Sequence, residues 1–405
     1  MVHQPPTGAR DLLPLDVAQK YWIEERLRQV FRRWGYHWII TSTLERLDTL
    51  KAGGAIQPST VIEVYDENEV LGLRPELTAS IARATVTRMA GATYPLRLYY
   101  IANVFRRAGE RIHGGQQEFY QAGVELLGAG GLMADAEILL LLSDCLQSLG
   151  LSRWRVILGE AQLMRSLLSA FPPALQDKVR HAIANLDRVT LENLPLSPEL
   201  RERALLLFDL RGRPADVLQR VGSLELDAHQ RQIVNTLKSL IELLQECSPA
   251  DKQVILDLSL IQTFDYYTGI VFEVVSETDA GQCVLGQGGR YDQLLGLYDP
   301  QGQITPGIGF CWNIEELQQV LLPTGLLPED TVPCEYLVVP VTPQDSAAAF
   351  AYAQNLRGSG ELVRVEVELG LRDTPESLRE YALRRGIKHI ARIRSAGNPE
   401  LETLI

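Results

Sequence analysis

The chain has 405 residues, 46% of them hydrophobic and 22% charged, which is ordinary for a soluble protein of two or three domains. Its formal net charge of -12 disfavours broad electrostatic capture of nucleic acid, because phosphate binding needs a cationic surface. The five cysteines include no Cys-x-x-Cys pair, so we expect reduced thiols and no metal site. A cytoplasmic location is expected, since the N-terminus lacks a signal pattern and the apolar run at 138–142 is far too short to cross a bilayer.

The N-terminal part of the chain begins with a predicted helix over about residues 16–34, whose apolar side chains recur at helical spacing. A strand is predicted over 36–41, and a hairpin over 61–65 and 70–73. Glu76 follows the hairpin and precedes another predicted helix. An acid at this place commonly stabilises a helix N-terminus. The alternative interpretation is a carboxylate that meets the ammonium group of a ligand.

Two further strands are predicted on either side of a polar loop at 108–117. Arg106 follows the first strand, and the second strand, over 118–125, carries Gln121 and Glu125. Residues four apart on a strand share a face, so these two side chains are expected to point the same way. On the residues alone, a solvated arginine and a solvated polar face are at least as well supported as a binding site.

The middle of the chain is predicted to be largely helical. A helix over 133–149 and a strand over 154–158 precede an almost purely helical stretch from about 167 to 247. The basic residues of that stretch are interspersed with acids, which indicates solvated helix faces and not a nucleic-acid groove.

The stretch from 258 to 273 carries two adjacent tyrosines, Tyr266 and Tyr267, ahead of a predicted strand that includes Val271. Adjacent residues of a strand point to opposite faces, so one tyrosine is expected in the core and the other outside it. The glycine-rich run at 286–292 lacks the lysine and hydroxyl residue of a Walker phosphate loop and favours an ordinary turn.

The C-terminal part begins with a short predicted helix, for which Asn313 is interpreted as the cap and Glu316 as a favourable first-turn acid. A proline-marked segment at 323–333 is the predicted linker to a further domain. Strands and helices then alternate, over 335–339, 343–356, 362–367, 374–384 and 387–393. This order predicts a small, mostly parallel sheet.

Taken together, these motifs resemble those of class II aminoacyl-tRNA synthetases, and of histidyl-tRNA synthetases in particular. Residues 16–41 resemble the first class II motif, which builds a dimer interface, while 96–127 resemble the second motif and 305–317 the third. The resemblance implies an α+β fold, with a core that holds an antiparallel sheet flanked by helices. It implies the following domains: a core at 1–322 with a helical insertion at about 165–250, a linker at 323–333, and a small α/β domain at 334–405.

The resemblance also implies a histidine site. The matching residues are Glu76, Gln121, Glu125, Tyr266, Tyr267 and Tyr291. The family's three ATP-binding arginines correspond here to Arg106, Gln262 and Glu316, so one cation of three is kept. Adenylate formation depends on fixed cations, and a charge pair about 4 Å apart is worth about 4 kcal/mol at an effective dielectric of about 20. We therefore expect a histidine-binding site with no catalytic residue and no cofactor, which does not bind ATP productively.

A histidine site without activation chemistry is similar to that of the regulatory subunits of ATP phosphoribosyltransferase, paralogues of histidyl-tRNA synthetase. This resemblance implies a non-catalytic partner of a short-form catalytic subunit in the first step of histidine biosynthesis, which permits feedback inhibition by histidine. It implies a homodimer within a larger hetero-oligomer, with neither membrane nor tRNA as a partner. Two alternatives stay open: a working histidine–tRNA ligase, and an amino-acid-sensing or tRNA-binding module with another partner. Histidine-driven ATP–pyrophosphate exchange would favour the first, and co-purification with tRNA the second.

Overall fold

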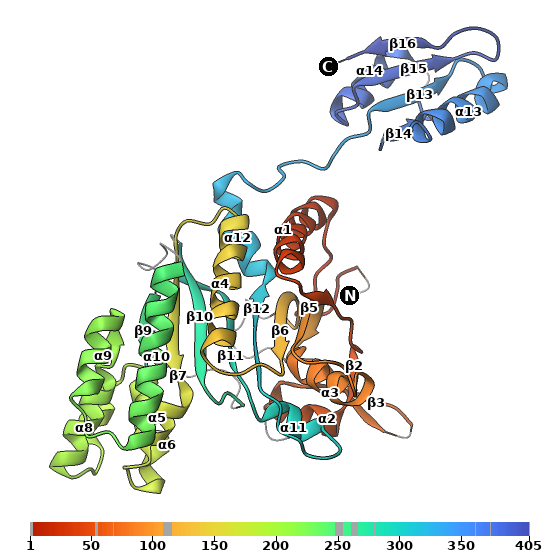
Figure 1. The fold of residues 1–405 in the computed structure, drawn as a ribbon. Helices are drawn as coiled ribbons and strands as arrows, with labels where there is room; N and C mark the ends of the chain where they lie inside the picture. The colour runs from red at the N-terminus through yellow and green to blue at the C-terminus, as the bar shows by residue number, and fades with distance from the viewer. Residues whose placement is uncertain are drawn as a thin grey trace. The chain divides into compact units, whose positions relative to one another are not determined.

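The computed structural model describes residues 3–52, 56–67, 69–107, 116–247, 254–260, 266–278, 281–360, 362–372 and 374–404. The chain divides into two compact units, Met1–Pro328 and Glu329–Ile405 (Figure 1). None of the helices in these described ranges is both long enough and apolar enough to cross a membrane.

A nine-stranded sheet forms the centre of the larger unit. In sheet order its strands are β1 (His37–Trp38), β5 (Leu96–Phe105), β6 (Glu118–Leu127), β12 (Gly307–Asn313), β11 (Gly281–Arg290), β10 (Ile270–Thr278), β7 (Trp154–Glu160), β9 (Val254–Asp257) and β8 (Arg211–Gly212). Neighbours are antiparallel except for β1 with β5 and β7 with β9. The predicted antiparallel sheet is therefore confirmed, although the strand expected at 36–41 is paired only at His37–Trp38.

One face of this sheet is covered by α1 (Pro14–Arg33), α4 (Leu132–Ser148) and α12 (Ile314–Leu321), which lie together in Figure 1. The predicted apolar stripe of the first helix is buried, including Ile23, Leu27 and Phe31. Phe31 meets Phe310 of β12 edge-on, with ring centroids 6.5 Å apart. Helix α1 begins with Pro14, whose missing N–H costs nothing in the first helical turn.

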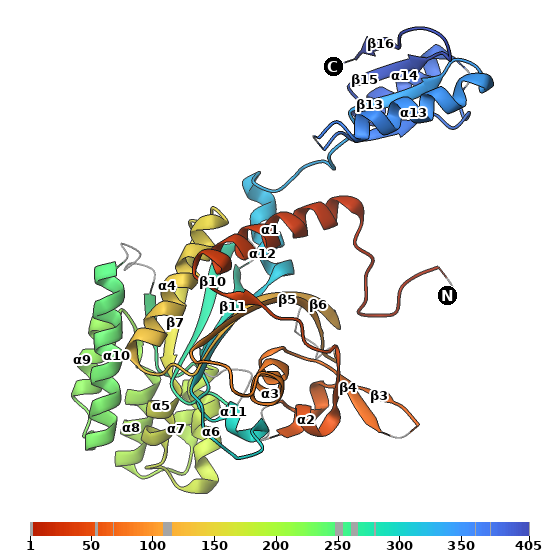
Figure 2. The ribbon, with the colours of Figure 1, turned by 45° about the vertical axis from the view of Figure 1, so that its right-hand side comes forward.

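The opposite face carries a second apolar cluster. The smaller elements that cover it lie together in Figure 2. These elements are α2 (Leu47–Lys51), α3 (Thr78–Arg88), α11 (Leu294–Tyr298) and a three-stranded sheet of β2 (Leu44–Arg46), β4 (Val70–Leu73) and β3 (Ile62–Tyr65). The predicted hairpin is confirmed as the antiparallel pair β3 and β4. Tyr100, Tyr267 and Tyr291 belong to this cluster, so the candidate site lies on this face.

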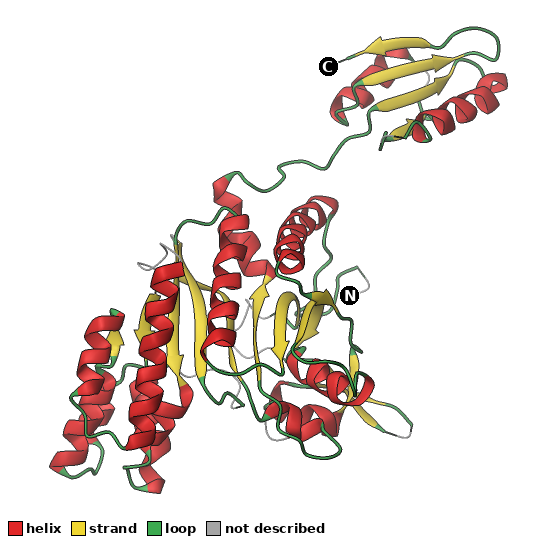
Figure 3. Ribbon diagram, viewed as in Figure 1, coloured by secondary structure: helices red, strands yellow, loops and turns green. Residues whose placement is uncertain are grey.

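A group of helices is inserted in the chain between β7 and β9; Figure 3 draws them in red, as it does every helix. It comprises α5 (Ala161–Leu168), α6 (Pro173–Ala184), α7 (Arg188–Asn193), α8 (Pro198–Phe208), α9 (Pro214–Gly222) and α10 (Ala228–Cys247). The expected helical stretch is thus present, but it also contains β8, a two-residue strand that pairs with β9. Two residues are too few for a sequence pattern to reveal.

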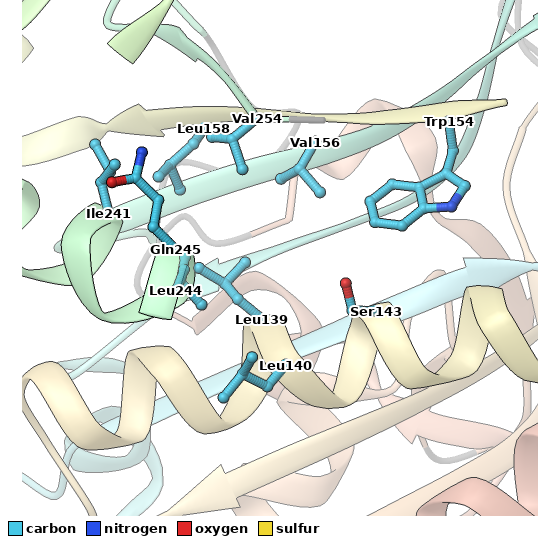
Figure 4. Close-up of a pocket in the computed structure, with 10 residues that line it drawn as sticks. All are labelled: Leu139, Leu140, Ser143, Trp154, Val156, Leu158, Ile241, Leu244, Gln245 and Val254. Carbon is cyan, nitrogen blue, oxygen red and sulfur yellow. The ribbon is translucent and has the colours of Figure 1, made fainter. Parts of the chain in front are cut away.

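An apolar cavity lies where α10 packs against α4 and β7 (Figure 4). Its empty volume is about 530 Å³. Leu139, Trp154, Leu158 and Ile241 are among its lining residues, and Ser143 and Gln245 are the polar ones among the ten in the figure. Such a lining suits apolar groups and offers little to an amino acid with two charged ends.

The glycine-rich run is a strand and not the predicted turn. Gly286, Gly288 and Gly289 lie in β11 between β10 and β12. A Cβ atom at Gly286 would lie 2.5 Å from the carbonyl oxygen of Cys311, and one at Gly289 would lie 2.7 Å from Cδ1 of Tyr267. The glycines are therefore needed for the close approach of neighbouring groups and not for a bend in the chain.

The smaller unit is a four-stranded sheet with a helix on each face. Its strands, in order, are β14 (Val365–Val367), β13 (Tyr336–Pro340), β15 (His389–Ile393) and β16 (Glu400–Thr403). Val338 packs in one cluster with α13 (Ser346–Arg357), while Leu337 and Val339 pack in another with α14 (Pro375–Arg384). The expected parallel strands are confirmed; the antiparallel edge strand β16 is an addition that the sequence pattern did not predict.

Candidate functional site

A small polar cavity lies on the sheet face beneath α3 and α11, with an empty volume of about 330 Å³. It is lined by Glu76, Thr78, Tyr100, Arg106, Gln121, Tyr266, Tyr267, Gln287, Gly288, Tyr291, Gly309, Phe310 and Cys311. Five of the six residues predicted to hold histidine are in this lining, and the sixth, Glu125, accepts hydrogen bonds from two of its members. The cavity of Figure 4 is larger, but this one carries the polar groups.

Alternation along the strands of the sheet places several of these residues on the face of the cavity. Gln121 and Glu125 of β6 lie on the same face, as do Gly309 and Cys311 of β12. Gln121 and Glu125 are each 1% exposed, so the alternative of a solvated polar face is wrong.

Glycines leave space for the side chains in and around the cavity. Gly309 pairs with Glu125 across β12 and β6, and a Cβ atom there would overlap the Glu125 carboxylate. A Cβ atom at Gly123 would collide with Tyr100, and one at Gly307 would collide with Tyr291. These backbone positions leave room for the acid and the tyrosines, and a side chain would remove that room.

Glu76 takes the structural role of a helix-terminal acid and also lines the cavity. Its carboxylate accepts backbone N–H groups from Thr78 at 2.6 Å and from Ala79 at 2.8 Å, at the start of α3. Burial raises the pKa of Glu76, and its hydrogen bonds from Ala79 and from the backbone and side chain of Thr78 oppose that rise. The two interpretations offered by the sequence are therefore compatible, because one carboxylate can end a helix and face a ligand.

Glu125 is held by hydroxyl groups. Thr78 Oγ1 donates to its Oε1 at 2.7 Å, and Tyr291 donates through its hydroxyl to Oε2. Burial raises the pKa of Glu125 to about 8, against the opposing effect of those two hydrogen bonds. Thr78 thereby connects the two acids, since its N–H binds Glu76 and its hydroxyl binds Glu125.

The adjacent tyrosines do not point to opposite faces as predicted. Both Tyr266 and Tyr267 line the cavity, with ring centroids 4.7 Å apart, and Tyr266 meets Tyr291 edge-on at 5.8 Å. Strand alternation does not apply to them because β10 begins only at Ile270. Three aromatic rings therefore enclose one side of the space.

Arg106 is part of the cavity wall and is not a solvated strand-end residue. Its Nε donates to the carbonyl oxygen of Pro75 at 2.7 Å, and its guanidinium carbon lies 5.0 Å from the Phe119 ring centroid. Burial lowers its pKa. Among the described lining residues Arg106 is the cation, and it shares the cavity with Glu76.

The other two positions matched to ATP-binding arginines supply no cation. Gln262 lies outside the described residues. Glu316, in the first turn of α12, accepts a hydrogen bond from Cys283 Sγ at 2.8 Å. Asn313 does precede α12, but its side chain does not cap it; instead its Oδ1 accepts from Gln121 at 3.3 Å.

Several lining residues had escaped the sequence analysis, notably Thr78, Tyr100, Gln287 and Cys311. Gln287 and Cys311 are register partners on β11 and β12, so knowledge of that pairing would have identified them. Arg290, in contrast, is structural: it binds Asp135 at 2.6 Å and Asp292 at 3.0 Å. In the described part of the chain, no group of three or more His, Cys, Asp or Glu side chains is placed to hold a metal ion.

Comparisons with known proteins agree with this fold. Residues 8–317 match the family model described as histidyl-tRNA synthetase. The chain is 65% identical over 405 residues to the ATP phosphoribosyltransferase regulatory subunit of Nostoc punctiforme, with 100% of both chains covered. It is 62% identical over 403 residues to the protein of the same name from Trichormus variabilis, with 99% of both covered.

Solved structures give the same result. The structure of an ATP phosphoribosyltransferase regulatory subunit/histidyl-tRNA synthetase from Bacillus halodurans matches with a TM-score of 0.79 at 28% identity, covering 94% of this chain and 97% of that one. A histidyl-tRNA synthetase from a Nostoc species matches in fold, with a TM-score of 0.77 at 21% identity and coverage of 96% and 91%. The predicted class II synthetase-like fold is thus confirmed, and the chain belongs to the family of ATP phosphoribosyltransferase regulatory subunits.

Proposed function

We propose that this chain is the non-catalytic regulatory subunit of a cytoplasmic ATP phosphoribosyltransferase. In this role it activates a short-form catalytic subunit, which condenses ATP with phosphoribosyl pyrophosphate, and makes that reaction sensitive to histidine. The observation that carries the proposal is identity of 65% over the full length to a protein named as such a subunit. Feedback requires that histidine bind the active and inhibited complexes with different affinity.

The polar cavity is the proposed histidine site. Glu76 and Glu125 would attract the ligand's ammonium group, while Gln121 and the tyrosine hydroxyls would hydrogen-bond to the imidazole and carboxylate. Enclosure by three tyrosine rings favours a flat aromatic group. A ligand with one cationic end and one polar ring fits this combination of charge and shape.

Loss of nucleotide chemistry is the second part of the proposal. At the position matched to an ATP-binding arginine of histidyl-tRNA synthetases, Glu316 adds negative charge, and the side chain of the nearby Asn313 contacts Gln121. Arg106 alone would have to stabilise both the attacking carboxylate and the phosphate. A histidine-dependent exchange of pyrophosphate into ATP would contradict this part.

Transfer RNA is not expected as a partner, because most of the arginines in the described part of the smaller unit form salt bridges with acids. Salt bridges join Arg372 to Glu368 at 2.8 Å and Arg385 to Glu366 at 2.9 Å. Further pairs are Arg379–Glu402, Arg384–Glu380, Arg392–Glu402 and Arg394–Glu400. Phosphate binding would have to compete with these acids for the same guanidinium groups.

Reconstitution tests the proposal directly. The full chain is mixed with a short-form ATP phosphoribosyltransferase catalytic subunit, and phosphoribosyl transfer is followed with and without L-histidine. We expect the catalytic subunit to gain activity on mixing and to lose it again when histidine is added. Absence of any stimulation by the full chain, under conditions where the two proteins co-elute, would overturn the proposed function.

We further propose that the chain forms a homodimer through α1 and β1 within the larger complex. β1 is an edge strand, paired on one side with β5, and apolar side chains are exposed around it. Trp38 is 50% exposed and Ile40 77% exposed, and Val17 and Tyr21 are exposed on α1. Exposed apolar side chains on both elements are typical of a surface that a second subunit covers.

A charge at Ile40 should separate the subunits. Ile40→Glu would place an unpaired carboxylate in the interface, so we expect light scattering after size-exclusion chromatography to report a monomer where the parent chain gives a dimer. The matched control is Val189→Glu, which adds the same charge at an exposed valine of α7 and should leave the dimer intact. A dimer that survives Ile40→Glu would place the interface elsewhere.

A further inference from the structure

The two acids of the polar cavity differ in their donors. Each carboxylate oxygen of Glu76 accepts a backbone N–H group, which can only donate, and Glu76 also has a side-chain hydrogen bond with Thr78. Glu125 accepts from the hydroxyls of Thr78 and Tyr291, and a hydroxyl can turn and accept a proton in its place. A proton on Glu76 would meet N–H groups, whereas a proton on Glu125 would find an oxygen able to receive its hydrogen bond. The arrangement therefore suits an ionised Glu76 and a neutral Glu125.

The burial of the two acids and the charges near them also favour an ionised Glu76 and a neutral Glu125. Both acids are buried, at 3% and 1% exposure, and they are linked through Thr78, so two negative charges there would repel each other in a poorly hydrated space. Arg106 can offset one of them, and its charge favours the ionised form of Glu76.

The remaining titratable groups that face the acids do not ionise near neutral pH. They are Tyr100 from β5, Cys311 from β12, and Tyr266, Tyr267 and Tyr291 from the segments around β10 and β11, together with Tyr298 of α11, which interacts with Glu76, and Tyr36, which interacts with Glu125. Burial raises the pKa of every one of these tyrosines, and that of Cys311 to about 12. Among the described residues around the cavity, the two glutamates are thus the groups able to exchange a proton at neutral pH.

We propose that the empty cavity holds Glu125 as a neutral carboxylic acid, and that capture of a cationic amino acid displaces its proton to solvent. The O–H bond of the Glu125 carboxyl group breaks, and the ligand's positive charge replaces that of the proton beside the resulting carboxylate. Ligand binding then depends on pH, because every occupied site has released a proton. The release of a proton on ligand binding rests on the proposed histidine site. The neutral state of Glu125 in the empty cavity does not depend on it.

The sign of the pH dependence follows from this exchange. Below the pKa of Glu125, which is about 8, a proton must leave before the cation is held, so the affinity for histidine rises with pH. The rise is at most about tenfold per pH unit, and it ends where Glu125 is already ionised in the empty site. At pH 7.5 the imidazole of free histidine is largely neutral, with a pKa of about 6.5, so its own titration contributes little there.

Two measurements on the full chain test the inference separately. The first is infrared difference spectroscopy of the ligand-free protein at pH 7 against Glu125→Gln, in which we expect an un-ionised carboxyl band that the variant lacks. The second is titration calorimetry of L-histidine at pH 7.5 in two buffers of different ionisation enthalpy. We expect roughly half to one proton released per histidine, and none in Glu125→Gln.

Glu273→Gln is the matched control, because Glu273 is a partly buried acid of β10 that does not line the cavity. It should keep both the carboxyl band and the proton release. A ligand-free protein without the band, or proton release that persists in Glu125→Gln, would overturn the inference. If histidine does not bind at all, the proposed site is wrong, and the infrared band still decides the protonation of Glu125.

Discussion

Replacing Glu76 by alanine should abolish sensitivity to histidine while leaving activation of the catalytic partner in place. Glu76 is 3% exposed and lines the cavity, so its carboxylate would meet the ligand's ammonium group away from bulk water. Truncating one partner of a buried, hydrogen-bonded charge pair costs about 2–5 kcal/mol, which corresponds to an affinity loss of roughly 30-fold to several-thousand-fold. Calorimetry with the isolated chain and the reconstituted assay with histidine should both report it.

A loss of folding must be separated from this loss of binding, because Glu76 also accepts the N–H groups of Thr78 and Ala79. Glu76→Gln keeps one carbonyl oxygen for the helix start and removes the charge. We expect its thermal unfolding to lie closer to that of the parent chain, and its histidine affinity to fall nearly as far as in Glu76→Ala. Unchanged histidine affinity in a folded Glu76→Gln variant would remove this acid from the proposed site.

Replacing Gly309 by alanine should obstruct the proposed histidine site. A Cβ atom at this position overlaps the carboxylate of Glu125 and the carbonyl oxygen of Val124, which belongs to the backbone of β6 and cannot turn aside. Overpacking of this kind costs about 1–3 kcal/mol. If Glu125 yields, Gly309→Ala should lower histidine affinity about 5- to 150-fold in calorimetry.

Gly130→Ala provides the comparison, since its nearest heavy atom would be Pro306 Cβ at 3.5 Å, an ordinary contact. We expect that variant to bind histidine and unfold like the parent chain. Full histidine affinity in Gly309→Ala would mean that the Glu125 carboxylate can move without harm to the ligand, and would contradict its assignment to the site.

Sequence periodicity predicted most of the longer helices and strands, but it missed β8 and β16 and was insufficient for the site. The apolar stripe of α1 and the shared face of Gln121 and Glu125 on β6 follow from local spacing, and both agree with the structure. Bringing Glu76 beside Glu125 requires the packing of α3 against the sheet, which no local pattern contains. The resemblance to histidyl-tRNA synthetases supplied that long-range information, and the histidine-binding role it implies remains a prediction.

Where local rules were wrong, a neighbour in space explains the difference. Strand alternation would separate Tyr266 from Tyr267, but the chain reaches its sheet only at Ile270, so both rings turn to the cavity. The glycine-rich run looked like a turn, yet Gly286 and Gly289 are strand residues crowded by Trp312 and Tyr267. Neither outcome could be derived without knowing which strands lie next to each other.

The two backbone hydrogen bonds that Glu76 accepts affect how the presence of this acid in related sequences should be interpreted. An acid that accepts two backbone N–H groups would be kept for folding even in a protein that had lost its effector. Glu125 is different, because its hydrogen bonds come from the side chains of Thr78 and Tyr291. Among homologues, the joint presence of those three side chains is therefore a better marker of retained ligand recognition than Glu76 alone.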